Sequence, residues 1–278
     1  ADWFVEGAAG IAMRFGIPQL VIGLTIVAMG TSAPEAAVSI AAAVKGNADI
    51  TIGNIVGSNI LNILVILGLA ASIVPIAVAR STVRIEMPFM IAITALLFYQ
   101  GRDGSISLAD GGVLMVAFAA YMMYLYTMAM KSNVDSDLEE PGLPLGRCLL
   151  GAVGGLALII AGSNVTVGAA TSIATYAGLS ERFIGLTIVA LGTSLPELFT
   201  SVAAARRGNA DIAIGNIVGS NIFNILFVVG LSSLIIDIPF ASAFNFDTYV
   251  ALGAAVLLWL CVLRTQRLQR WAGALMLV

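Results

Sequence analysis

The chain contains no histidine and few charged side chains. Only 10% of its 278 residues are charged, with a net charge of −3, whereas a soluble domain carries roughly 25%. Without histidine, the commonest transition-metal ligand and the commonest proton shuttle are absent. The two cysteines, Cys148 and Cys261, lie in or beside apolar runs and predict neither a metal site nor a disulfide. No basic cluster suggests nucleic acid as a partner, and no cofactor is expected.

Long apolar runs are what the sequence has instead. Hydrophobic residues make up 59% of the chain, and the mean hydropathy is +1.00. Runs of about 20 apolar residues recur along the whole length, as in an all-α polytopic protein of the lipid bilayer. We expect ten transmembrane helices, at residues 1–13, 19–44, 50–76, 86–100, 107–130, 147–177, 182–205, 212–237, 247–263 and 270–278.

The sequence also repeats itself. Residues 22–35 (IGLTIVAMGTSAPE) match residues 184–197 (IGLTIVALGTSLPE), and residues 45–64 match 207–226 at the same shift of 162. About three-quarters of positions 22–69 are identical to their partners without a gap. A period this long indicates two copies of one half-protein.

The copies define the expected domains. Residues 1–130 form the N-terminal half, 131–146 a short acidic linker, and 147–278 the C-terminal half. Five crossings separate a residue in the second span from its copy in the seventh, and because five is odd the halves must be inverted. The shift pairs the first and last residues with positions inside full spans, so we expect the first and last spans to be incomplete.

The basic residues predict the orientation. Ten lie in loops on one side of the membrane: Arg14, Arg80, Arg84, Lys131, Arg147, Arg206, Arg207, Arg264, Arg267 and Arg270. Only Lys45, Arg102 and Arg182 lie on the other. Cytoplasmic loops are enriched in lysine and arginine. We therefore expect a plasma (inner) membrane protein with a cytoplasmic linker and both termini outside.

Two carboxylates sit near the centres of their spans, Glu35 and Glu197, whereas the other acidic residues lie in loops or near span ends. A carboxylate at that depth costs several kcal/mol unless it is paired, solvated or neutralised. No lysine or arginine lies at matching depth, which leaves protons, the other carboxylate, or bound cations. Since the two are copies of one another, we expect them to meet at one central site.

The residues around each glutamate favour a cation site. Ala28, Thr31, Ser32 and Glu35 follow one helix face, and Pro34 leaves the Gly30 carbonyl without its helical donor. The second copy supplies Ala190, Thr193, Ser194 and Glu197, with Pro196 acting on Gly192. Two further i, i+4 pairs are Ser58 with Asn62 and Ser220 with Asn224. All these groups offer oxygen, which suits Na⁺ or Ca²⁺ and not Zn²⁺ or Cu²⁺.

Several motifs have structural interpretations as well. The glycines of GNIVG, at 53–57 and 215–219, are typical of close helix packing. Asn54, Asn59, Asn216 and Asn221 can form hydrogen bonds between helices. The stretch YMMYLY at 121–126 is typical of span packing and interfacial anchoring.

The paired motifs, GTSxPE followed by GNxxGSNxxN, resemble the α-repeats of the sodium/calcium exchanger family within the calcium/cation antiporters. The similarity covers nearly the whole chain, because ten spans in two inverted halves is also that family's architecture. The resemblance implies an electrogenic antiporter that moves about three Na⁺ against one Ca²⁺.

The resemblance also implies roles for the residues. Glu35 and Glu197 would bind Ca²⁺, and Thr31 and Thr193 would add backbone oxygens. The Na⁺ sites would use the carbonyls of Ala28 and Ala190, the same glutamates, and the serines Ser32, Ser194, Ser58 and Ser220. Asn62 and Asn224 would line the centre; some members have an aspartate at one of these positions, so a third carboxylate and any dependence on K⁺ are in doubt here.

The expected mechanism follows from charge. The two carboxylates carry a charge of −2. One Ca²⁺ neutralises this charge, and three Na⁺ leave a net charge of +1. The empty site therefore costs the most free energy to move through the low-dielectric closed state. Protons should compete, and Mg²⁺ should be transported poorly because it sheds water reluctantly. We expect the first and sixth spans to move across the site, and a monomer to be functional.

Other functions stay open from the residues alone. A proton-coupled cation antiporter is the main alternative. A passive cation channel could also use two acidic residues, although an inverted repeat with proline-broken spans favours a transporter. An intramembrane protease would need a second acid pair, a Ser–His pair or a metal set, and none is evident in the sequence.

Overall fold

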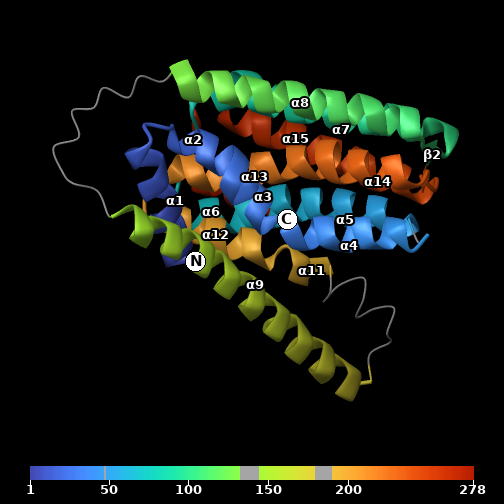
Figure 1. Ribbon diagram of the computed structural model, residues 1–278, viewed down its shortest axis with the longest axis horizontal. Coiled ribbons are helices and arrows are strands. Elements are labelled where there is room, and N and C mark those ends of the chain that lie inside the picture. Colours follow the sequence, from blue (N-terminus) through green and yellow to red (C-terminus); the bar gives the residue numbers. More distant parts are fainter. Residues whose placement is uncertain (47, 132–143, 179–189) are drawn as a thin grey trace.

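The computed structural model describes residues 1–46, 48–131, 144–178 and 190–278. Most of the long helices lie side by side, and α9 crosses them at a slant (Figure 1). The helices are α1 (Asp2–Arg14), α2 (Gln19–Ile22), η1 (Gly23–Val27), α3 (Ala28–Thr31), α4 (Ala33–Val44), α5 (Asp49–Ile60), η2 (Leu61–Leu67), α6 (Gly68–Ile73), η3 (Thr82–Glu86), α7 (Met87–Gln100), η4 (Gly101–Asp103), α8 (Leu108–Lys131), α9 (Leu145–Tyr176), α11 (Ala190–Thr193), α12 (Leu195–Arg206), α13 (Ala210–Phe223), η6 (Asn224–Val229), α14 (Gly230–Ile235), α15 (Ala243–Leu263) and α16 (Arg270–Met276).

Among the described residues, six continuous helices are long and apolar enough to cross a membrane. They are Ile50–Ile73, Thr82–Asp103, Leu108–Lys131, Leu145–Tyr176, Ala210–Ile235 and Ala243–Leu263. A seventh span forms if Gln19–Thr31 and Ala33–Val44, which meet at a bend of 51°, are taken together. The predicted multi-span helical class is thereby confirmed.

The count of ten stays a prediction. The predicted first and last spans correspond to α1 and α16, which are too short to cross alone. The predicted span at 182–205 is described only from residue 190 onward. Two helix starts were predicted four residues too late. The helix predicted to begin at residue 86 begins at Thr82, because a π-helical turn precedes α7, and the helix predicted to begin at residue 247 begins at Ala243.

The elements of the two halves recur at the shift of 162. The bounds of α3, α4 and α6 reappear in α11, α12 and α14, and the strands β1 (Ile76–Ala77) and β2 (Ser105–Ile106) reappear as β3 (Ile238–Pro239) and β4 (Arg267–Leu268). β1 pairs antiparallel with β4, and β2 with β3. Each sheet therefore contains one strand from each half. The β1–β4 sheet is the counterpart of the β3–β2 sheet, as expected for two halves related by a two-fold axis.

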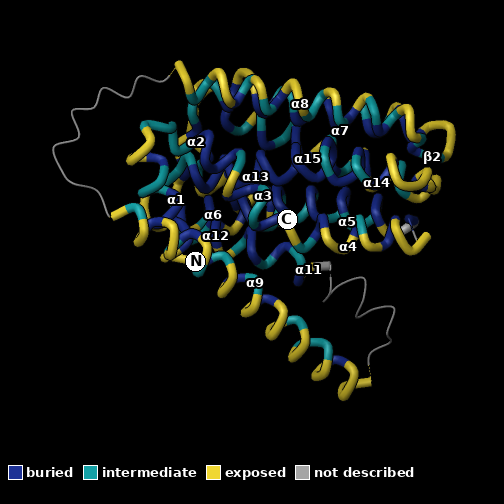
Figure 2. The backbone as a smooth tube through the Cα atoms, viewed as in Figure 1, coloured by how far each residue is buried: buried dark blue, intermediate teal, exposed yellow. Residues whose placement is uncertain are grey.

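The interior of the bundle is buried (Figure 2), and elements of both halves pack together there. In the helix Ala210–Ile235, 94% of an apolar 18-residue window is buried, compared with 17% in the helix Leu108–Lys131. α13 packs against η1 and α3 of the other half. Close approach there depends on glycine, since a Cβ on Gly219 would lie 2.8 Å from the Leu24 backbone. This supports the packing interpretation of GNIVG for the second copy; the corresponding partners of the first copy, near residue 186, lie outside the described residues.

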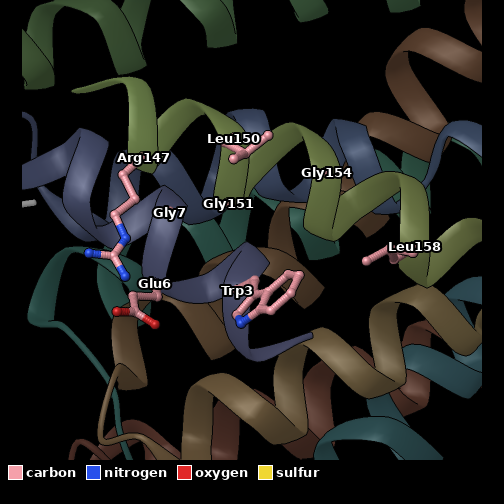
Figure 3. A pocket seen from close by; sticks show the side chains of 8 residues that line it. All are labelled: Trp3, Glu6, Gly7, Arg147, Leu150, Gly151, Gly154 and Leu158. Carbon is pink, nitrogen blue, oxygen red and sulfur yellow. The ribbon is translucent and has the colours of Figure 1, made fainter. Parts of the chain in front are cut away.

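A second glycine contact joins α1 to α9. A Cβ on Gly7 would lie 2.4 Å from the Ala152 nitrogen, and one on Gly155 would lie 2.6 Å from the Phe4 nitrogen. Beside this contact lies a groove of about 360 Å³, with Arg147 and Glu6 at one end and Leu158 at the other (Figure 3). No predicted site residue lines this groove.

Candidate functional site

Each GTSxPE motif lies at a break in its helix. α3 ends at Thr31 and α4 begins at Ala33, with Ser32 at φ −81° and ψ 6°. In the second copy Ser194 has nearly the same angles, φ −87° and ψ 3°. A proline follows two residues later in each copy and has no N–H to donate to the carbonyl four residues before it. The break predicted at both motifs is therefore present.

The two carboxylates are buried and meet across the halves. Glu35 and Glu197 are each 1% exposed. The Ser32 hydroxyl donates to Oε1 of Glu197 at 2.8 Å, and the Ser194 hydroxyl donates to Oε1 of Glu35 at 3.2 Å. Each glutamate is thus held by the serine of the other copy, and the two motifs form one centre.

Four oxygens at this centre are shielded from solvent and accept no hydrogen bond from any described residue. They are Oε2 of Glu35, Oε2 of Glu197, Oδ1 of Asn62 and Oδ1 of Asn224. Leaving a buried acceptor unsatisfied costs about 1–3 kcal/mol, and more for a charged group. Their accumulation at one place is what a site that coordinates a cation requires.

The orientation of the two asparagines follows from a clamp formed by Asn59 and Asn221. The Asn221 amide nitrogen donates to the main-chain oxygen of Asn59 at 3.2 Å. A carbonyl can only accept, so Oδ1 of Asn221 faces the other way and accepts from Nδ2 of Asn62 at 2.9 Å. The amide of Asn62 is therefore turned so that its Oδ1 lies away from the clamp.

The second half of the clamp repeats this pattern. Nδ2 of Asn59 donates to the Asn221 carbonyl at 3.3 Å, and Oδ1 of Asn59 accepts from Nδ2 of Asn224 at 3.1 Å. The predicted hydrogen bonds between helices are confirmed for Asn59 and Asn221. Their consequence, which the sequence did not predict, is that both central asparagines present oxygen instead of N–H₂.

A second pair of asparagines supports the glutamate backbones. Nδ2 of Asn54 donates to the Glu35 carbonyl at 3.2 Å and to the Ser39 hydroxyl at 2.9 Å. Asn216 makes the same two contacts in the other copy, with Glu197 and Ser201. Oδ1 of Asn216 also accepts from the Thr31 hydroxyl at 2.9 Å, which ties the first motif to α13.

The remaining predicted residues lie around the same centre. The Ala28 carbonyl accepts from Ser220 at 3.4 Å and from Thr31 at 3.3 Å. Ser58 is buried, and its hydroxyl oxygen accepts a hydrogen bond from the Ser194 hydroxyl at 3.4 Å. Ala190 and Thr193 occupy the equivalent positions of α11. Within the described residues no three His, Cys, Asp or Glu side chains form a metal-binding group, so any ion here is held by two carboxylates and neutral oxygens, a set for hard cations.

One buried carboxylate was missed. The sequence placed Glu86 at a span end and assigned Tyr121 and Tyr124 to packing and anchoring. In the structure Glu86 is fully buried and accepts a hydrogen bond from the Tyr124 hydroxyl. The three-residue spacing of the tyrosines, which puts both on one helix face, was the available signal.

Comparisons with known proteins identify the family. The profile of the family described as "Sodium/calcium exchanger protein" matches residues 1–127 and 148–278. The chain is 41% identical to the putative antiporter CaxA of Alkalimonas amylolytica, covering 97% of this chain and 87% of that protein. It is 32% identical to the sodium/calcium exchanger MaX1 of Methanosarcina acetivorans, covering 100% and 91%.

A solved structure shows the same fold. The sodium-calcium exchanger NCX_Mj, soaked with 2.5 mM Na⁺ and 10 mM Sr²⁺, superimposes with a TM-score of 0.86 at 35% identity, covering 99% of this chain and 90% of that one. The family profile covers most of the chain and the fold agrees over nearly its whole length. This chain is a membrane protein that belongs to the sodium/calcium exchanger family.

Proposed function

We propose that this chain is a secondary antiporter that exchanges Na⁺ for Ca²⁺ by alternating access around the centre formed by Glu35 and Glu197. The observation that carries the proposal is the set of four buried, unsatisfied oxygens, two from carboxylates and two from amides. They come in equal numbers from the two halves. A cation at the centre would satisfy all four at once.

The charges of the site explain why transport would be coupled. The two carboxylates carry −2 when ionised, and no described lysine or arginine forms an ion pair with either one. Moving them uncompensated through a closed state costs several kcal/mol per charge. One Ca²⁺ cancels the charge and about three Na⁺ exceed it by one, so only a loaded site crosses cheaply and exchange replaces leak.

The ligand set also gives a size preference. Ca²⁺ accepts six to eight oxygens in irregular geometry, whereas Mg²⁺ requires a tight octahedron and keeps its water. The centre offers carboxylate, amide and hydroxyl oxygens from both halves, and we expect little Mg²⁺ transport.

The moving part of the cycle is assigned to α1 and α9. They contact each other through Gly7 and Gly155 at backbone distance, and α9 lies at the edge of the bundle (Figure 1). Two exposed ion pairs link α1 to the end of α12, from Arg207 to Asp2 at 3.0 Å and to Glu6 at 3.3 Å. Exposed pairs contribute little stability, so a glycine-packed α1–α9 pair can shift as one unit.

The test is Na⁺-gradient-driven ⁴⁵Ca²⁺ uptake into proteoliposomes. Wild type should accumulate Ca²⁺. The uptake by Glu197→Gln should be at least about tenfold lower, because losing one charged ligand costs more than about 1.4 kcal/mol of binding free energy. Asp103→Asn is the matched control, since it removes an exposed carboxylate at the end of η4 and should leave uptake unchanged.

Three outcomes would contradict the proposal. Undiminished uptake in Glu197→Gln would remove the carboxylate from the site. Equal uptake driven by a pH gradient without Na⁺ would make the protein proton-coupled. Flux that persists with no counter-ion on the opposite side would indicate a channel.

A further inference from the structure

A second buried polar cluster lies between η3 and α8, away from the centre. Glu86 is fully buried, its Oε1 accepts from Tyr124, and its Oε2 has no hydrogen-bond partner among the described residues. Thr82 lies one helical turn before Glu86 in η3, and the Tyr121 ring stacks on the Tyr124 ring with their centroids 6.3 Å apart. The hydroxyl oxygens of Thr82 and Tyr121 are also buried and unpartnered in the described part of the chain.

Among the described residues, no positive side chain forms an ion pair with Glu86. The ion pairs formed by described residues involve only Arg207 with Asp2 and Glu6. The adjacent Arg84 is exposed. The sequence of residues 132–143, which follows α8, contains no lysine or arginine. A carboxylate buried in a membrane protein without a positively charged partner is costly and marks a candidate binding site.

The cluster has no copy in the second half. At the shift of 162, the position equivalent to Glu86 holds Thr248. The Thr248 hydroxyl donates a hydrogen bond to the Phe244 carbonyl of its own helix. The residues of the centre, in contrast, are paired across the halves. Glu86 is therefore not a displaced part of the central site, and its role does not depend on the proposed transport function.

We propose that Glu86, Tyr121 and Thr82 form an accessory Na⁺ site. The cluster offers one carboxylate and neutral hydroxyls, so a monovalent ion balances its charge, whereas a divalent ion would leave a buried excess of +1. The free Oε2 and the two hydroxyl oxygens supply hard ligands. The π-helical turn of η3 is a feature found often at functional sites, and the Trp259 indole fixes it by donating to the Val83 carbonyl at 2.8 Å.

This site is placed to influence the centre through α8. α8 packs along η6, where Phe118 lies 5.2 Å from Phe227, centroid to centroid. η6 begins at Asn224, which carries one of the four unsatisfied oxygens of the centre. Na⁺ held between η3 and α8 would fix α8 against the helix that carries this ligand.

The experiment uses the full chain with the central site removed. In Glu35→Gln/Glu197→Gln, replacing choline by Na⁺ at constant ionic strength should raise Tm by about 3–5 °C at saturation. Adding Glu86→Gln should abolish the shift. Adding Tyr124→Phe should keep it, because Oε2 and its two neighbouring hydroxyls remain.

A binding measurement covers variants that fold poorly. Wild type should bind one ²²Na⁺ more than Glu86→Gln, and Tyr121→Phe should weaken that ion's binding several-fold. A Na⁺-dependent shift that survives Glu86→Gln would overturn the proposal. So would a shift that depends on pH but not on Na⁺, because the occupant would then be a proton.

Discussion

The asparagine clamp predicts that replacing Asn224 by aspartate destabilises the protein even though the shape is conserved. In the wild type Nδ2 of Asn224 donates to Oδ1 of Asn59 at 3.1 Å. A carboxylate oxygen in that place would face another acceptor. Asn59 cannot relieve the conflict by turning its amide, because its Nδ2 would then leave the Asn221 carbonyl and bring an oxygen against it.

The magnitude follows from these contacts. One lost hydrogen bond contributes about 1 kcal/mol, and a buried acceptor left unsatisfied costs about 1–3 kcal/mol. Together they predict a loss of about 2–4 kcal/mol in the free energy of unfolding, or a fall in Tm on the order of 5–10 °C. The new charge at a centre that already holds two carboxylates adds to this in ion-free buffer.

The assay is thermal unfolding of purified protein in choline with a chelator, from pH 8 to pH 5. Once protonated, the carboxyl introduced by Asn224→Asp can donate to Oδ1 of Asn59 as the amide does, so the deficit should be full at pH 8 and shrink as the pH falls. Asn224→Leu offers no proton, and its deficit should not change with pH. Equal stability of Asn224→Asp and wild type at pH 8 would refute the assigned amide orientation.

Three further predictions test the packing, the break and the ion pairs. Gly155→Leu should lower the free energy of unfolding by at least about 3 kcal/mol, since the new side chain would clash with the α1 backbone. Gly162→Leu on the same helix, where a Cβ meets nothing within 4 Å, should be tolerated when the two variants are compared by thermal unfolding. Pro196→Ala restores an N–H that can bond to the Gly192 carbonyl, and it should weaken the apparent Ca²⁺ affinity about tenfold in flux titrations if that carbonyl serves the site. Arg207→Gln removes two exposed ion pairs and should change the free energy of unfolding by less than about 1 kcal/mol; a larger loss in denaturant titrations would show that these pairs hold α1 rigidly.

The features predicted from the sequence are those that depend on local chemistry or on the repeat. A proline inside a helix removes an N–H donor and kinks or breaks the helix, so interruptions near Ser32 and Ser194 could be predicted from GTSxPE. Pro88, which lies within the continuous helix Thr82–Asp103, shows that a proline alone does not always end a helix. The repeat then required the two glutamates to be related by symmetry, and the serine contacts between the halves confirm that they meet. The ligand roles of these residues stay predictions.

The features that were missed depend on contacts between distant segments. Glu86 follows Arg84 in the sequence, and two nearby charges end an apolar run, so the pattern placed the span boundary there. The structure buries Glu86 because α8 brings the Tyr124 hydroxyl to it, a contact across 38 residues that no local pattern contains. The amide orientations of Asn62 and Asn224 depend on four side chains from both halves and could not be read from either copy.

The pairing of contacts at the centre bears on how this exchanger would distinguish its two faces. Each hydrogen bond to a carboxylate and each bond of the asparagine clamp has a counterpart in the other half. A centre built in this way presents nearly the same ligands toward both sides of the membrane. Differences in ion affinity between the faces would then have to come from residues without a counterpart. We expect such a difference at two residues. One is Glu86, whose equivalent position in the second half holds Thr248, and the other is Arg207, which forms ion pairs with the acidic residues of α1.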